Sequence, residues 1–324
     1  MNKTILLATI AVLLVAGCTT PQGFQWPFQQ ITMTTIGGAG MVMTDFSPYL
    51  AGVSSGQTNK IFVTVSNMGG FAVPDADSLV YLTGSAINLT TGADQSLYWT
   101  STTETSLIKK LNKDPMKPAD PINDIPADEK QIYWSLKAPN VSVREQKSYL
   151  FIGRVYYDYQ TKVTGNMWVY SDTEADAAKA ASKSLNKATF TSTSGPVAIT
   201  AKLTQDPVVL YSGEDSVTLS LRISSVGGGV LYKQGVIDYS TTDPNMLNLT
   251  ADQINKVDIG IKLAGVALSN DCTGEKELIG GKELPLTCDI TVDRPATFSS
   301  LPIEITANYG YYQERTATVT VSGR

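Results

Sequence analysis

Short runs of alternating apolar and polar residues dominate the chain from Ile31 onward. The clearest run is 217–223, in which valine, leucine and isoleucine alternate with threonine, serine and arginine. The runs 61–66, 197–203 and 316–321 repeat this pattern. Alternation with period two is typical of half-buried antiparallel strands, and the Gly, Pro, Asn and Ser residues between the runs are typical of turns. The pattern predicts an all-β fold of antiparallel β-sandwich type.

Two stretches of the chain resemble each other closely enough to indicate an internal duplication. The first copy begins with Ser-Gly at 55–56, has a glycine pair at 69–70 and ends with a tyrosine-rich run at 155–160. The second copy has the same features at 212–213, 227–228 and 307–312. We therefore expect two tandem sandwich domains, 29–171 and 196–324. A chain of 324 residues is long enough for each domain to bury its own core.

The segment 172–195 is expected to link the two domains. Its first part is rich in alanine, lysine and serine, and Ser171 or Asp172 is placed to cap a short helix. A disordered linker is the alternative. Asp172, Glu174 and Asp176 fall in this segment, where a solvated helix face is expected rather than a catalytic pair of acids.

The beginning of the chain is typical of an export signal. An apolar run, Ile5 to Val15, follows Lys3 and is too short to cross a bilayer core, which takes roughly 20 helical residues. It closes on Val15, Ala16 and Gly17 before Cys18. This pattern resembles the lipobox of bacterial and some archaeal lipoproteins, with Val15 in place of the more usual leucine. The resemblance implies a signal peptide at 1–17, a diacylglycerol on the Cys18 thiol and a tether at 18–28; an ordinary cleaved signal peptide and an uncleaved anchor are the alternatives.

Composition excludes several classes of function. The net charge is −5, and no window carries the clustered Lys and Arg that a nucleic-acid binder needs, so nucleic acid is not expected as a partner. The chain has no histidine, which excludes Ser-His-Asp, Cys-His and HExxH chemistry. We expect neither an enzyme nor a bound cofactor.

Cys272 and Cys288 are the only cysteines besides Cys18. In an exported protein, such a pair is better explained by a disulfide than by a metal site or redox pair. The glycines and charged residues between them suggest a long hairpin held by this bond.

An acidic, Pro-rich loop at 107–130 interrupts the first predicted domain and looks inserted. It contains four aspartates, Asp114, Asp120, Asp124 and Asp128, that offer oxygen ligands for Ca²⁺. Their spacing fits no calcium loop, and lysines between them partly neutralise the segment. A solvated connection is therefore the expected role, with calcium as the less favoured alternative.

The tyrosine-rich run holds Tyr156, Tyr157 and Tyr159, with Trp168 and Tyr170 nearby. These rings suggest a binding platform, but alternation places Tyr156 opposite Tyr157 and Tyr159, so we expect one of these two sets in the core. Three sequons follow the predicted signal peptide, at Asn88, Asn140 and Asn248. They would carry N-glycans in an exported archaeal protein or arise by chance in a chain rich in Ser and Thr.

The stretch from Ser55 to Gly70, with its echo from Ser212 to Gly228, resembles the start of Ig-like adhesion-related or CARDB-type domains of prokaryotic surface proteins. The runs 132–139 and 154–161 are similar to late strands of repeat domains in archaeal envelope proteins. The resemblance implies Ig-like β-sandwiches used for adhesion, spacing or assembly, and it supplies no catalytic residues.

These observations predict a surface lipoprotein, held on the outer face of the membrane by lipid on Cys18. Its expected role is non-catalytic adhesion, envelope attachment or assembly, with other envelope proteins or glycans as partners. The alternative is a glycan- or peptide-binding lipoprotein that uses loops or the crease between the domains.

Overall fold

The computed structural model describes residues 38–324, except 85, 91, 92, 95 and 214. The described residues belong to one compact unit. The predicted signal peptide at 1–17, its motif Val15, Ala16 and Gly17, the lipidated Cys18 and the tether at 18–28 lie outside the described residues. Within the described ranges, no helix has both the length and the apolar character needed to cross a membrane.

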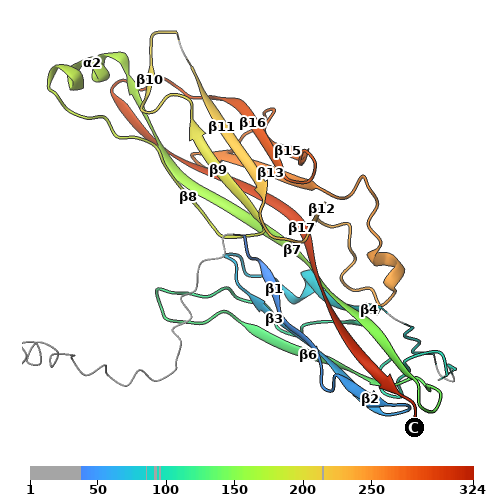
Figure 1. Ribbon diagram of the computed structural model, residues 1–324. Coiled ribbons are helices and arrows are strands. Elements are labelled where there is room, and N and C mark those ends of the chain that lie inside the picture. Colours follow the sequence, from blue (N-terminus) through green and yellow to red (C-terminus); the bar gives the residue numbers. More distant parts are fainter. Residues whose placement is uncertain (1–37, 85, 91–92, 95, 214) are drawn as a thin grey trace, which may run out of the picture. The chain divides into compact units, whose positions relative to one another are not determined.

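The regular secondary structure is almost all β-strand, arranged in three sheets (Figure 1). The first sheet has the order β1-β3-β6 (Met41–Pro48, Thr58–Asn67, Glu129–Lys137), and the second has the order β16-β11-β9 (Glu283–Thr291, Ser216–Ser225, Val197–Leu203). The main path of the third sheet is β14-β13-β17-β7-β4-β5 (Val266–Ala267, Lys256–Leu263, Phe298–Ser322, Gln146–Ser171, Ser78–Gly84, Ile108–Lys109). Short strands that pair beside this path are β2 (Gly52–Ser54), β8 (Thr189–Ser192), β10 (Val208–Leu210), β12 (Val230–Tyr232) and β15 (Gly274–Glu277). The predicted all-β sandwich class is confirmed.

Two long strands form the centre of the third sheet. β7 and β17 pair antiparallel along their whole length, from Gln146 opposite Ser322 to Tyr170 opposite Phe298. We call this pair the central ribbon. Both faces of its middle are buried: Tyr157 and Tyr159 lie in the main hydrophobic cluster, whereas Tyr156 lies in a second cluster with Tyr232 and Tyr239. The aromatic run is therefore part of the core, as the interpretation from alternation expected.

The two halves of the chain repeat the same pairings about the centre of the ribbon. Asp158 lies opposite Gly310, with Tyr157 opposite Tyr311 on one side and Tyr159 opposite Tyr309 on the other. The sheet β1-β3-β6 in the first half corresponds to β9-β11-β16 in the second. Two short parallel pairings also correspond, β10 with the end of β7 and β2 with the end of β17.

Each ribbon strand crosses from strands of its own half to strands of the other. The first part of β7 pairs with β4 of the first half, while its last residues pair with β10 of the second half. The main hydrophobic cluster likewise contains residues of both halves. The expected boundary at 172–195 therefore does not separate two hydrophobic cores, because β7, which precedes this segment, pairs with β10, which follows it.

The segment 172–195 contains a helix and a strand. Helix α2 (Asp172–Ala180) begins at Ser171, whose Oγ accepts a hydrogen bond from Glu174 N at 3.3 Å, and Asp172 forms an ion pair with Arg294. β8 then pairs with β7. The predicted short, capped helix is confirmed, and Ala178 is its one buried residue.

Cys272 and Cys288 form a disulfide, as predicted from the fact that they are the only cysteines besides Cys18 in a chain that we expect to be exported. The expected hairpin between them is wrong. β15 pairs with β13 of the third sheet, whereas β16 pairs with β11 of the second. The chain between the two cysteines therefore passes from one sheet to the other, and the disulfide holds this crossing in place.

The loop 107–130 is partly integrated into the core. Its β5 residues pair with β4, and Leu111 and Met116 are fully buried. Met116 exchanges backbone hydrogen bonds with Val73, and its carbonyl accepts a bond from Asn67 Nδ2 at 2.7 Å. The expected solvated connection is therefore only part of its role, because the loop also contributes buried side chains to the hydrophobic core.

Candidate binding face

Three aromatic side chains lie in a row on the solvent side of the first sheet. Tyr49 follows β1, Phe62 lies on β3 and Tyr133 lies on β6, opposite Phe62. The ring centroids are 6.4 Å apart between Tyr49 and Phe62 and 5.7 Å apart between Phe62 and Tyr133. Tyr49 is 70 % exposed and Tyr133 is 44 % exposed. We call these three residues the aromatic row.

The strand pattern explains why these rings face water. Along β3 and β6, the neighbours Ile61, Val63, Ile132 and Trp134 are buried, so the residues between them point to the opposite face. Polar residues are expected there. Aromatic side chains at such positions form an exposed apolar strip that the hydrophobic core does not use.

The second sheet provides an internal comparison. Tyr49 N donates to Lys60 O at 2.7 Å, and Thr204 N donates to Thr218 O at 3.0 Å in the corresponding place. Two residues after Lys60 on β3 lies Phe62, and two residues after Thr218 on β11 lies Ser220, so these two positions correspond. Their partners on the next strand, Tyr133 and Thr287, correspond as well. The three equivalent positions, Thr204, Ser220 and Thr287, are all exposed. The same sheet therefore forms without aromatic residues at these positions.

Two lysines lie beside the aromatic row. The Lys60 ammonium is 4.4 Å from the centroid of the Tyr133 ring, and the Lys109 ammonium is 5.7 Å from it. Lys109 also forms an ion pair with Glu104 at 2.7 Å. Lys60 forms no ion pair with any side chain in the described part of the chain.

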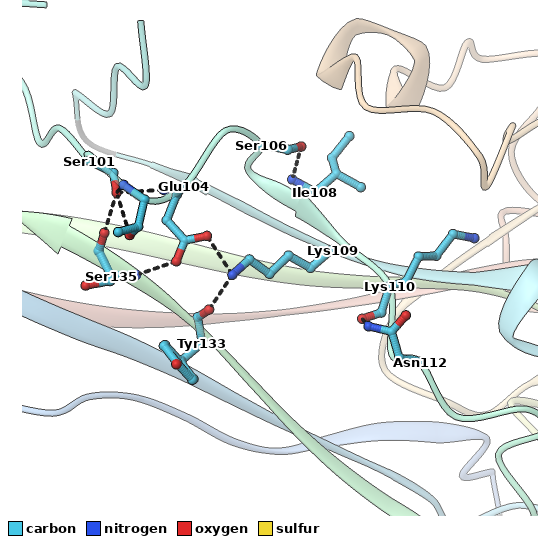
Figure 2. A network of polar contacts seen from close by, with 10 residues as sticks. Ser101, Glu104, Ser106, Ile108, Lys109, Lys110, Asn112, Tyr133 and Ser135 are labelled. Atoms are coloured by element: carbon cyan, nitrogen blue, oxygen red, sulfur yellow. Dashed lines mark hydrogen bonds and ion pairs between the residues drawn. The ribbon is translucent and has the colours of Figure 1, made fainter. Parts of the chain in front are cut away.

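Side chains cover the outer edge of β6 beside the row, as Figure 2 shows. Glu104 Oε1 accepts a hydrogen bond from Ser135 N at 3.0 Å, and Ser101 Oγ donates to Ser135 O at 2.8 Å. Lys109 Nζ donates to Tyr133 O at 2.7 Å. Because these backbone groups are already hydrogen-bonded, this part of the edge is closed to another β-strand.

A groove of about 370 Å³ adjoins the row at Tyr133. Its polar lining consists of Glu104, Lys109, Lys110, Asn112 and Gln131. Ammonium, carboxylate and amide groups together can donate to and accept from a hydroxyl-rich ligand. The row and the groove thus combine a flat apolar surface with a polar recess.

A smaller hollow of about 240 Å³ lies near Lys233 and Lys256. Both lysines contact Glu275, at 2.8 Å and 3.7 Å. Its cations are already paired with this carboxylate, and it contains no aromatic side chain, so it is a weaker candidate for a binding site.

The aspartates considered for calcium are not gathered into a site. Asp128 pairs with Lys113 at 3.4 Å, Asp114 accepts from Asp75 N, and Asp120 accepts from Asn123 within its own turn. Asp124 is exposed. Among the described residues, no group of three or more metal-ligating side chains lies together.

The sequons lie in loops outside the aromatic row. Asn140 and Asn248 are exposed, and Asn88 is half-buried with its Oδ1 accepting from Thr90 N at 2.9 Å. Glycosylation at all three stays a prediction.

The sequence interpretation did not single out the aromatic row. The signal was present in the duplication: in the paired runs 61–66 and 219–224, phenylalanine and serine occupy the same polar-side position. Tyr133 and Lys109 are far from this run in sequence: the register of the first sheet brings Tyr133 beside Phe62, and β5 of the third sheet brings Lys109 to the Tyr133 ring.

No protein-family model matches the chain, and no curated protein does. Among the solved structures that align with it are two bacterial adhesins, and both align weakly. One is described as the Enterococcus faecalis MSCRAMM ACE, which binds its ligands by the collagen Hug model; it is 9 % identical over 87 % of this chain and 96 % of its own, with a TM-score of 0.14. The other is the collagen adhesin CNA from S. aureus, 11 % identical over 89 % of this chain and 94 % of its own, with a TM-score of 0.11. Scores this low are not evidence of a common fold.

Proposed function

We propose that this protein is a membrane-tethered surface protein that attaches to a component of the cell envelope through the aromatic row, without catalysing a reaction. The lipid anchor is the part of the proposal that depends on the N-terminal sequence pattern. The attachment surface is the part that depends on the fold.

The observation that carries the proposal is the difference between the two equivalent sheets. Thr204, Ser220 and Thr287 show that threonine and serine satisfy the fold at the positions of the aromatic row. Tyr49, Phe62 and Tyr133 therefore need another explanation, and exposed clusters of tyrosine and phenylalanine are typical of binding surfaces.

The closed edge of β6 favours binding on the face of the sheet. A partner that added a strand would need free backbone groups, whereas Ser135 already has both of its own groups hydrogen-bonded to side chains. The face next to this edge carries the exposed rings.

A co-sedimentation assay with envelopes of the organism that encodes the chain tests this function. The variant Y49T/F62S/Y133T gives the first sheet the residues of the second, and T204A/S220A/T287A is the matched control. Burying a large apolar side chain contributes about 1.5–3 kcal/mol, and about 1.4 kcal/mol corresponds to a tenfold change in affinity. We expect the first variant to bind at least about tenfold more weakly and the control to bind like the wild type. Equal binding by all three proteins would contradict the proposal.

Incorporation of radiolabelled lipid tests the anchor separately. We expect the wild type to acquire label in cells and Cys18→Ser to acquire none. Label in the serine variant would contradict anchoring at this residue and would leave the binding face unaffected.

A further inference from the structure

We propose that the ligand of the aromatic row is an acidic polysaccharide, whose sugar rings stack on Tyr49, Phe62 and Tyr133 and whose carboxylates pair with Lys60. This inference rests on the proposed function, because it specifies the partner of the same face.

The rings account for the sugar part of the ligand. A pyranose presents a face of C–H groups, which packs against an aromatic ring by dispersion and weak C–H contacts. The centroids of the row are 6.4 Å and 5.7 Å apart, and the rings lie on strands that are neighbours in one sheet. An extended chain of rings can therefore cross the strands and contact more than one aromatic side chain.

The groove accounts for hydroxyl groups. Glu104, Asn112 and Gln131 provide both donors and acceptors beside Tyr133. Ile132 and Tyr133 complete the lining, so the groove is mostly polar, whereas a peptide would use apolar pockets for its hydrophobic side chains.

Lys60 is the reason that we infer an acidic ligand rather than a neutral one. Its ammonium lies over the Tyr133 ring and has no carboxylate partner in the described ranges, whereas the carboxylate of Glu104 is paired with Lys109. A neutral glycan would leave this cation without a counter-charge next to the stacked sugar. A uronate would supply one, and the pair would be partly shielded from water by the rings around it.

The lining of the groove favours a polysaccharide over a nucleic acid. Aromatic rings with lysines also form stacking platforms for single-stranded nucleic acids, but those proteins surround the platform with a positive groove. Here Glu104 contributes a carboxylate to the groove, which can accept hydrogen bonds from sugar hydroxyls but finds no donor on a phosphate backbone.

Titration calorimetry with a polymer panel tests the ligand class. The acidic probes are polygalacturonate, alginate and hyaluronan; the neutral probes are methyl-esterified polygalacturonate and xylan, and an oligo(dT) represents nucleic acid. We expect the full chain to bind at least one acidic probe. If it binds polygalacturonate, it should do so at least about tenfold more tightly than it binds the methyl ester of this polymer. The affinity should decrease with added salt.

Two lysine variants make the test specific. Lys60→Gln should lose most of the preference for the acidic polymer, and Lys202→Gln is the matched control, because Lys202 is exposed and lies opposite Ser220 on the second sheet. Equal binding of acidic and neutral polymers, or an unchanged preference in Lys60→Gln, overturns the acidic assignment. Tighter binding of oligo(dT), or no binding of any polymer, overturns the polysaccharide assignment. None of these outcomes overturns the proposed function, which fails in the sedimentation assay if Y49T/F62S/Y133T still binds envelopes like the wild type.

Discussion

Asp158 is a buried carboxyl group at the centre of the ribbon. It is 8 % exposed, and its Oδ1 accepts a hydrogen bond from the Tyr239 hydroxyl at 2.6 Å. Tyr239 in turn contacts the Tyr232 hydroxyl at 2.8 Å, and the Tyr232 ring covers Gly310, where a Cβ would lie only 2.0 Å from the ring. This network attaches the loop after β12 to the ribbon.

Burial raises the pKa of Asp158 to about 6, with a further contribution from the carboxylate of Asp77 and an opposing one from the Tyr239 hydrogen bond. The carboxyl group is therefore neutral in the fold at a pH where it is already ionised in the unfolded chain. Its contribution to the free energy of unfolding is complete below pH 4 and is lost as the pH rises through about 6.

We expect Asp158→Asn to remove this pH dependence, because the amide stays neutral and its oxygen still accepts from Tyr239. The free energy of unfolding of the variant minus that of the wild type should increase by up to about 3 kcal/mol between pH 4 and pH 7. Urea denaturation at several pH values measures the difference. A difference that stays constant over this range would show that Asp158 does not titrate as described.

At the scale of single elements, the period-two pattern predicted the strands well. The runs 61–66, 197–203 and 217–223 lie within β3, β9 and β11. Every second residue of these runs, beginning with Ile61, Val197 and Val217, is apolar and buried, which is the physical reason that alternation is informative. Alternation within one strand could not identify which aromatic residues on a polar face form a binding site, because a binding site depends on the side chains of the neighbouring strands.

The disulfide stabilises the crossing between the second and third sheets. Closing a loop of this length contributes roughly 3 kcal/mol in the chain-entropy model. We expect C272A/C288A to lower the free energy of unfolding by about this amount in urea denaturation. A reducing agent should have the same effect on the wild type and none on the variant. If reduction leaves the wild-type transition unchanged, the bond contributes nothing to stability.

The length of the central ribbon was not evident from the sequence. Gly153 and Gly165 resemble strand breakers, yet both lie inside β7. A Cβ on Gly153 would lie 3.0 Å from the Phe46 ring, and one on Gly165 would lie 2.2 Å from Thr189 O. These glycines allow close packing against other strands, which is a long-range requirement that local sequence does not reveal.

At the scale of the whole described unit, the ribbon makes the two halves depend on each other. Tyr157 and Tyr159 of the first half pair with Tyr311 and Tyr309 of the second, and all four are buried. The duplication predicted from sequence is thus visible as repeated pairings, whereas we expected each domain to bury its own core and the two halves contribute to one hydrophobic cluster.

Separate production of residues 37–171 and 196–324 tests this dependence. Each fragment alone would expose its ribbon tyrosines, so we expect neither to unfold cooperatively by itself. Mixed together, they should form a 1:1 complex in size-exclusion chromatography and recover the near-ultraviolet circular dichroism of the full chain. Cooperative unfolding of each isolated fragment would instead support two independent domains.

Hydroxyl-radical footprinting of the full chain bound to envelopes tests the central claim most directly. Tyr49 and Tyr133 are 70 % and 44 % exposed in the free protein, and Tyr211 and Phe298, at 56 % and 54 %, are comparable side chains of the second half. The account predicts that binding reduces oxidation at Tyr49, Phe62 and Tyr133 and leaves Tyr211 and Phe298 unchanged. Protection of Tyr211 or Phe298, with Tyr49 and Tyr133 oxidised as in the free protein, would contradict it.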